Sequence, residues 1–151
     1  MKKYFFITIL ISFFFCSFSQ IPEKANLVIY TADSIQNLEL LKECVNSLKK
    51  LGYIIDNLDK DFYLVTTEPI EGKNFSQIKL DLYIVKNEVK IYSYVRNFTG
   101  IGDIPYSKWF RGEYVTGLKI TKYRWKKQLE FVKELHSNVK YGNEKYLIEN
   151  L

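Results

Sequence analysis

The stretches Gln77-Ile-Lys-Leu-Asp-Leu-Tyr-Ile-Val85 and Val89-Lys-Ile-Tyr-Ser-Tyr-Val-Arg96 decide the fold of this chain. Apolar side chains at alternate positions predict two strands, each with one apolar face and one polar face. A two-residue turn at Asn87-Glu88 would join them in an antiparallel hairpin. In this register three pairs lie opposite one another: Lys86 and Val89, Ile84 and Ile91, and Tyr83 and Tyr92.

Two segments have the 3.6-residue periodicity of amphipathic helices. The first helix is expected at about 33–51, where Asp33 and Gln36 have the spacing of a capping box. The second helix is expected at about 120–139. The apolar stripe of the first helix consists of Leu38, Leu41, Cys44, Val45, Leu48 and Leu51, and that of the second of Trp125, Leu129, Val132, Leu135 and Val139.

The remaining pattern completes an α+β domain in the order β-α-β-β-β-β-loop-α. Consecutive hairpins predict a single antiparallel sheet of about five strands, with both helices packed on its Ile/Leu/Val face. Residues 97–118 are expected to form an irregular loop, and residues 143–151 a frayed end. The three further strands are expected at 26–31, 53–58 and 62–68.

The first residues have the pattern of a secretory signal peptide. Two lysines precede an uncharged apolar run over 4–15, and cleavage is expected after Ser19. Residues 20–151 would then form the mature protein as one domain, periplasmic or secreted, with no transmembrane segment. Two alternatives stay open. One is a retained anchor, although the run is shorter than the roughly 20 residues that span a bilayer. The other is lipidation at Cys16, although Phe15 stands where a small residue is usual.

Composition excludes several classes of protein. The chain has 151 residues, a net charge of +5 and 47% hydrophobic residues, which excludes wholesale disorder. Two cysteines exclude a dense disulfide scaffold.

A resemblance rests on the segment after the first expected strand. The first helix ends in Leu51-Gly-Tyr53, and Ile54-Ile-Asp56, Asp59-Lys60 and Leu64-Val-Thr-Thr-Glu68 follow. Over about residues 26–96 this pattern resembles the helix-grip or TBP-like domains of the bacterial envelope. Examples are the lipoprotein subunit of the outer-membrane β-barrel assembly machine and related uncharacterised secreted proteins. The resemblance implies an interaction module and carries over no catalytic residue; the long aromatic loop departs from the family pattern.

Residue types that carry chemistry are sparse. His136 is the only histidine and has no ligand-spaced partner, so a histidine at the margin of the core is expected. Cys44 lies in an apolar stripe, which predicts a buried, inert thiol. Asp56, Asp59 and Asp61 lack the glycine and distal glutamate of a calcium loop. We therefore expect no catalytic site, metal or cofactor.

Two surfaces are candidate contact sites. The loop and the basic helix that follows it offer aromatic anchors with a cationic rim. The alternative is that the aromatics cover the core and that the lysines form a solvated flank. A second patch lies on the polar face of the hairpin, where tyrosines are otherwise ordinary cross-strand partners. The first set is Tyr106, Trp109, Phe110, Arg111, Lys122 and Lys126; the second is Tyr83, Tyr92 and Tyr94.

These expectations favour an exported, non-enzymatic interaction domain of the bacterial envelope. Its partner would be an envelope protein or an anionic surface, and an exported protein seldom meets nucleic acid. One alternative is a carrier that binds a small apolar ligand between the sheet and the last helix, which requires an enclosed apolar cavity. The other is an enzyme, which requires converging polar groups with perturbed pKa values.

Overall fold

A computed structural model describes residues 25–33, 35–71, 76–97, 109–111, 119–139 and 142–148. In these ranges the chain forms two helices and one antiparallel sheet of eight strands, which confirms the α+β class. The helices are α2 (Asn37–Lys50) and α3 (Lys119–Asn138). The strands are β1 (Leu27–Ala32), β2 (Ile55–Asp59), β3 (Leu64–Thr67), β4 (Ile70–Glu71), β5 (Ser76–Val85), β6 (Glu88–Asn97), β7 (Phe110–Arg111) and β8 (Gly142–Leu147).

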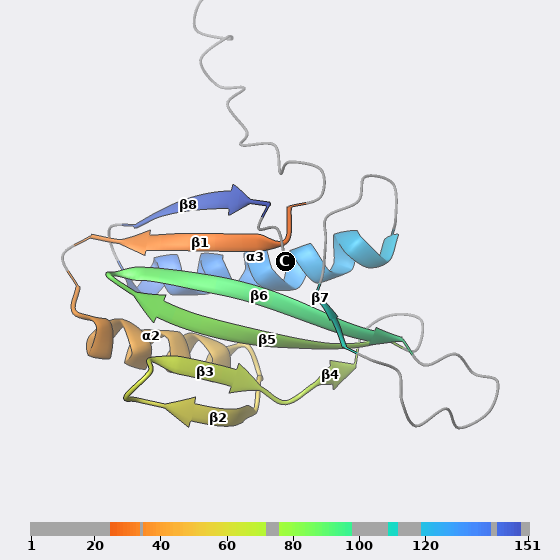
Figure 1. Ribbon diagram of the computed structural model, residues 1–151, viewed down its shortest axis with the longest axis horizontal. Coiled ribbons are helices and arrows are strands. Elements are labelled where there is room, and N and C mark those ends of the chain that lie inside the picture. Colours follow the sequence, from red (N-terminus) through yellow and green to blue (C-terminus); the bar gives the residue numbers. More distant parts are fainter. Residues whose placement is uncertain are drawn as a thin grey trace, which may run out of the picture.

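The main strands lie in the order β2-β3-β5-β6-β1-β8 (Figure 1). The short strands β4 and β7 pair with β5 and β6 respectively. The expected count of about five strands was too low, because β4 and β7 have only two residues each and show no alternation. The third additional strand, β8, lies in the segment that was expected to fray.

The central hairpin forms with the predicted faces and a different register. The turn residues are Lys86 and Asn87, with φ angles of 49° and 64°, and β5 pairs with β6 so that Val85 faces Glu88. The predicted turn at Asn87-Glu88 is therefore wrong by one residue. Two residues with positive φ match the twist of the strands, and Asn tolerates this conformation well. As a result Tyr92 lies opposite Asp81, and Tyr83 lies diagonally from Tyr92.

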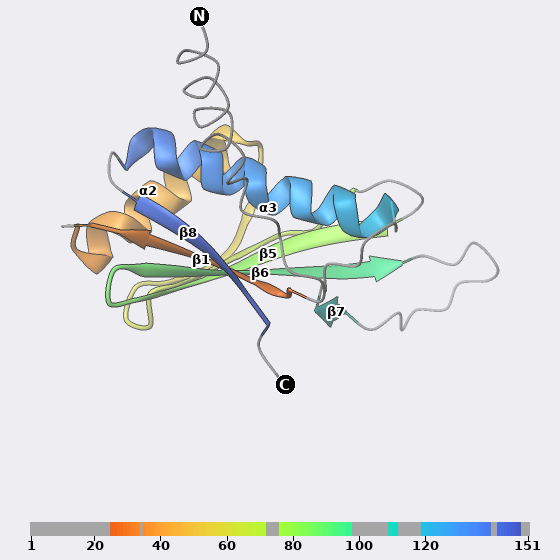
Figure 2. The same cartoon turned by 90° about the horizontal axis from the view of Figure 1, so that it is seen from above.

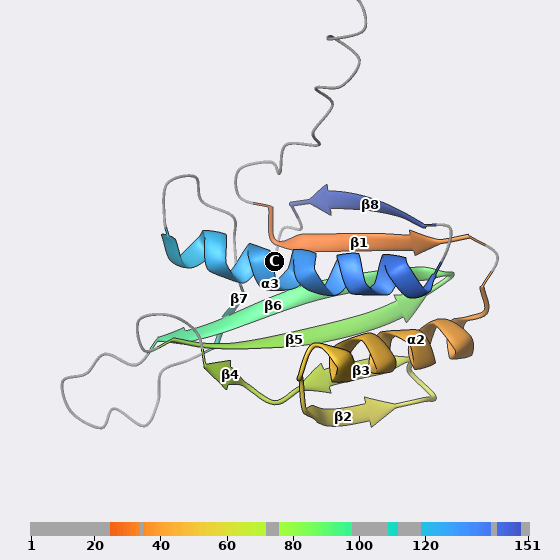
Figure 3. The same cartoon turned by 180° about the vertical axis from the view of Figure 1, so that it is seen from behind.

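Both helices lie side by side on one face of the sheet (Figures 2 and 3). Their apolar stripes bury the predicted Ile/Leu/Val face of β5 and β6. Side chains of this core include Leu40, Cys44, Leu48, Leu80, Leu82, Ile91, Trp125, Phe131 and Leu135. Polar contacts also join the helices: Lys50 Nζ lies 3.1 Å from Glu134 Oε1, and Asn138 Nδ2 donates to Ser47 Oγ at 2.9 Å.

The start of α2 differs from the prediction. The residue before the helix is Gln36, which makes no capping hydrogen bond with its side chain, and Asp33 lies in a turn upstream. The first helical residue is instead tied to the central hairpin, because Asn37 Oδ1 accepts a hydrogen bond from the Asn87 backbone N–H at 3.1 Å. Leu38, expected in the core stripe, is 45% exposed. The expected capping box is therefore wrong.

The expected fraying of residues 143–151 is wrong over most of that range. Residues 142–147 form β8, which pairs with the full length of β1 from Leu27 opposite Leu147 to Ala32 opposite Gly142. β1 thus lies between β6 and β8. This pairing brings the end of the described chain next to its beginning.

Candidate functional site

The face of the sheet opposite α2 and α3 gathers aromatic and basic side chains. Because successive residues of a strand point to opposite faces, the neighbours of the buried core residues of β5 and β6 point away from the helices. β7 extends the same face beside Tyr94, since Arg111 pairs with that residue. We call this surface the helix-free face; its residues are Lys79, Asp81, Tyr83, Lys90, Tyr92, Tyr94, Arg96, Trp109 and Arg111.

A basic group lies over each of three rings on the helix-free face. The Arg111 guanidinium lies 4.0 Å from the centre of the Tyr92 ring, and Lys79 Nζ lies 5.3 Å from that of Tyr94. Two cationic groups lie over the Trp109 ring. Arg96 lies 4.8 Å and Lys79 5.6 Å from its ring centre. The attraction between a cation and an aromatic ring holds these long side chains in defined positions.

Asp81 is the acidic residue within this cluster. It is 8% exposed, and its Oδ1 lies 3.7 Å from Lys79 Nζ. No described residue hydrogen-bonds to that oxygen. Burial raises the pKa of the Asp81 carboxyl, and nearby Lys79 opposes the rise only in part.

The structure brings the three tyrosines of the second candidate patch together. Tyr83 and Tyr92 meet edge to face with ring centres 5.6 Å apart, and Tyr94 follows Tyr92 on the same face of β6. Tyr83 is 38% exposed, while Tyr92 and Tyr94 are half-buried. The patch is therefore a continuous, partly accessible surface.

The residues of the first candidate surface separate into two groups. Trp109 and Arg111 lie on the helix-free face with the tyrosines, whereas Lys122 and Lys126 are exposed on α3, on the other side of the sheet (Figure 2). Tyr106 lies outside the described residues, and only the backbone of Phe110 is described. Sequence reasoning missed Lys79, Arg96 and Asp81; their alternation with the tyrosines along the hairpin was the available signal.

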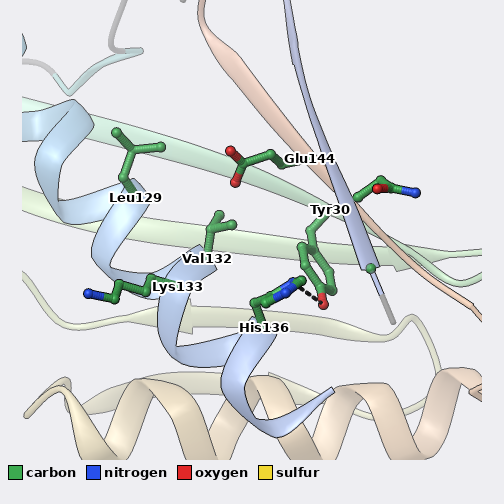
Figure 4. A pocket seen from close by; sticks show the side chains of 8 residues that line it. Tyr30, Leu129, Val132, Lys133, His136 and Glu144 are labelled. Carbon is green, nitrogen blue, oxygen red and sulfur yellow. Dashed lines mark hydrogen bonds between the residues drawn. The ribbon is translucent and has the colours of Figure 1, made fainter. Parts of the chain in front are cut away.

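A pocket of about 510 Å³ opens between the second half of α3 and the edge formed by β1 and β8 (Figure 4). At its base Tyr30 Oη donates to the Val139 carbonyl at 3.3 Å and lies 3.5 Å from His136 Nδ1. Sequence patterns did not predict this pocket, because one of its walls belongs to β8. Its lining residues are Tyr30, Leu129, Val132, Lys133, His136, Gly142, Asn143 and Glu144.

The chemistry of this pocket is mixed. Leu129 and Val132 supply an apolar side, and Lys133, His136 and Glu144 supply polar or charged groups to the lining (Figure 4). His136 was expected at the margin of the core and is exposed. An enclosed apolar cavity, which the carrier alternative requires, is a different kind of site.

The other residues considered as candidates from the sequence contribute to the core or to hydrogen bonds that stabilise the fold. Cys44 is fully buried in the core, and burial raises the pKa of its thiol. Asp59 Oδ1 accepts hydrogen bonds from the backbone N–H groups of Asp61 and Phe62, both at 3.0 Å, which orders the β2–β3 turn. Asp56 Oδ2 accepts from Thr66 Oγ1 at 3.3 Å. Among the described ranges, no three His, Cys, Asp or Glu side chains gather as a metal site would require.

In the part of the chain that the structure describes, neither helix is long and apolar enough to span a membrane. Comparison with protein-family models and with curated proteins yields no match. The geometry of the helix-free face and of the pocket is therefore the basis for any functional interpretation.

Proposed function

We propose that this protein is an exported, non-enzymatic interaction domain of the bacterial cell envelope that binds a partner protein through the helix-free face. The observation that carries the proposal is the concentration of Trp109, Arg96 and Arg111 beside three tyrosines on one sheet surface. Trp, Tyr and Arg are the residue types that most often dominate binding energy in protein interfaces.

The fixed positions of these side chains in the free protein support the proposal further. Ordering a flexible side chain upon binding has an entropic cost, which is smaller when the free protein already holds it in place. Arg111 and Lys79 are positioned over rings in the free chain. The resemblance of residues 26–96 to envelope interaction domains, and the signal-like residues 1–19, agree with a role outside the cytoplasm.

The carrier alternative has weaker support. Its ligand was expected to be apolar, whereas Lys133, His136 and Glu144 are among the residues that line the pocket beside α3. The helix-free face is a surface rather than a cavity, and it favours a macromolecular partner.

Site-specific cross-linking tests the proposal. A photoreactive amino acid is placed at Tyr83 on the helix-free face and, in a matched control, at Lys122 on α3, since both positions are exposed. We expect a discrete cross-linked partner from intact envelopes at position 83 that is absent at position 122. A partner captured only from position 122, or equally from both, would contradict the assigned surface.

A further inference from the structure

We infer that the pocket between α3 and the β1–β8 edge binds a small zwitterion of dipeptide size, whose carboxylate meets Lys133 and His136 and whose ammonium group meets Glu144. The pocket lies on the helix-covered side of the sheet, so this site is separate from the helix-free face and from the function proposed for it. The walls, the charges and the size of the pocket each support the assignment.

Two elements place groups of opposite charge on different walls of the pocket (Figure 4). On α3, Lys133 and His136 follow Leu129 by four and seven residues, a spacing that places all three on one stripe of the helix. On β8, Glu144 pairs with Tyr30 of β1, so both side chains lie on the helix-covered face of the sheet. A basic wall on α3 thus lies across the pocket from an acidic wall on β8.

The ammonium group of Lys133 is available to a ligand. It is exposed, and its Nζ forms no ion pair or hydrogen bond with any residue that the structure describes. The acidic residues of the same helix are already engaged. Glu130 Oε2 lies 2.8 Å from Lys127 Nζ. Glu134 Oε1 lies 3.1 Å from Lys50 Nζ. An incoming carboxylate can therefore pair with Lys133 without displacing an existing contact.

Glu144 has one partner and keeps the capacity for another. Its Oε1 accepts a hydrogen bond from Tyr146 Oη at 2.8 Å. A carboxylate has two oxygens and about four acceptor positions, so an ammonium group can bind at the same side chain. Burial chiefly raises the pKa of Tyr30 at the base of the pocket, and the nearby carboxylates of Asp33 and Glu144 add to the rise. This negative charge favours an ammonium group beside Glu144.

A ligand with both charges fits this lining better than a ligand with one. A lone anion in the pocket would be repelled by the Glu144 carboxylate, and a lone cation would be repelled by the Lys133 ammonium group. Because the two groups belong to different walls, a molecule with its charges at opposite ends can satisfy both.

The volume and the apolar side of the pocket define the size of the ligand. The pocket has a volume of about 510 Å³, within the roughly 300–1,000 Å³ that is usual for small-molecule sites. Leu129 and Val132 line its apolar side. A dipeptide with aliphatic side chains has an ammonium group at one end, a carboxylate at the other and apolar surface between them.

Chemical-shift titration with leucyl-leucine and two blocked forms of the same peptide tests the inference. N-terminal acetylation removes the ammonium charge, and C-terminal amidation removes the carboxylate charge. We expect the free peptide to bind at least about tenfold more tightly than either blocked form, because each blocked form loses a charge-assisted contact. Equal binding of the acetylated form would identify a site for anions, and equal binding of the amide a site for cations. Either result, or no saturable binding of the free peptide, would overturn the inference.

Matched variants locate the binding in the pocket. Lys133→Gln and Glu144→Gln should each weaken binding of leucyl-leucine about tenfold. The controls remove the same charges elsewhere: Lys145→Gln on the opposite face of β8, and Glu68→Gln after β3, should leave the affinity within about twofold. All four positions are exposed, and thermal melts verify that each variant is folded. Equal weakening by the controls would contradict the assigned site.

A steric variant tests the site without a change of charge. Leu129→Trp should fill the pocket from α3 and abolish binding; if this variant melts early, Leu129→Phe replaces it. Unchanged binding would place the peptide elsewhere, and tighter binding of glycerophosphoethanolamine would identify a lipid headgroup as the ligand; both results would overturn the inference. Failure here leaves the cross-linking at position 83 unaffected, since Tyr83 lies on the helix-free face.

Discussion

Gly142 lies directly against the aromatic ring of Tyr30, across the pair of strands β1 and β8. A Cβ at position 142 would overlap the hydroxyl end of that ring, and Tyr30 is only 1% exposed. The absence of a side chain at this position therefore allows β8 to close over the base of the pocket.

Gly142→Ala should lower the free energy of unfolding by about 1–3 kcal/mol, because the methyl group overpacks a buried site. Chemical denaturation measures the loss, and Asn143→Ala, at the exposed neighbouring position, is the control. An unchanged stability of the Gly142 variant would show that Tyr30 can move without penalty.

Leu80→Ala should lower the free energy of unfolding by about 2–5 kcal/mol, since a fully buried leucine loses its packing and leaves a cavity. Leu80 is 0% exposed on the helix-covered face. Val85→Ala, at a 49% exposed position of the same strand, should change stability by no more than about 0.5 kcal/mol. Similar losses in the two variants would contradict the assigned faces of β5.

Trp109→Ala should lower the free energy of unfolding by about 1–2 kcal/mol, the sum expected for loss of two cation–ring contacts. Trp109 is half-buried, whereas Trp125 is 2% exposed in the core. Trp125→Ala should therefore lower stability by about 3–5 kcal/mol. Urea unfolding of both variants measures the two losses of free energy of unfolding. Equal losses would identify Trp109 as a core residue.

Asp81→Asn should raise stability at neutral pH more than at acid pH. The pKa of the Asp81 carboxyl is raised in the folded state above its ordinary value of 3.8, mainly by burial. The folded state therefore binds the proton more tightly than the unfolded state, and this contribution to stability is lost as pH rises through the folded-state pKa. Asn cannot ionise, so the stability advantage of the variant should grow from about pH 3.8 upward. Unfolding curves at several pH values measure it; a variant that is less stable at neutral pH would mean that the pairing with Lys79 outweighs burial.

The intact mass of the protein from the native envelope fraction should correspond to residues 20–151, as expected for a cleaved signal peptide. Retention of residues 1–19 would indicate an uncleaved anchor. A mass that includes Cys16 together with a diacylglycerol group attached to it would indicate a lipoprotein.

Local patterns predicted which faces of the strands and helices are buried. Alternation over 77–96 identified both strands of the central hairpin and placed Leu80, Leu82 and Ile91 in the core. The same alternation could not determine the register, because moving the turn by one residue changes the pairing partners by two positions and keeps every face. In the observed register Val85 pairs with Glu88, and the two turn residues between them, Lys86 and Asn87, have positive φ angles.

Local sequence patterns could not predict strand pairings between residues that are far apart in the sequence. Residues 142–147 contain charged and polar side chains without alternation, and their strand exists because β1 offers a free edge. Likewise, β7 has two residues, too few for a periodic signal. Its pairing with β6 moves Trp109 and Arg111 away from the lysines of α3 and onto the helix-free face.

The position of β1 between β6 and β8 has a consequence for the order in which the chain folds during synthesis. The hairpin of β5 and β6 involves neighbouring residues and can form early, whereas the hydrogen bond from Tyr30 to Val139 joins residues 109 positions apart. Contacts between such distant residues slow folding, because a large loop must close first. Until the last strand emerges, β1 has an unpaired edge that can associate with other chains. A chaperone that shields this edge would therefore raise the yield of folded protein more than it would for a sheet built from consecutive hairpins.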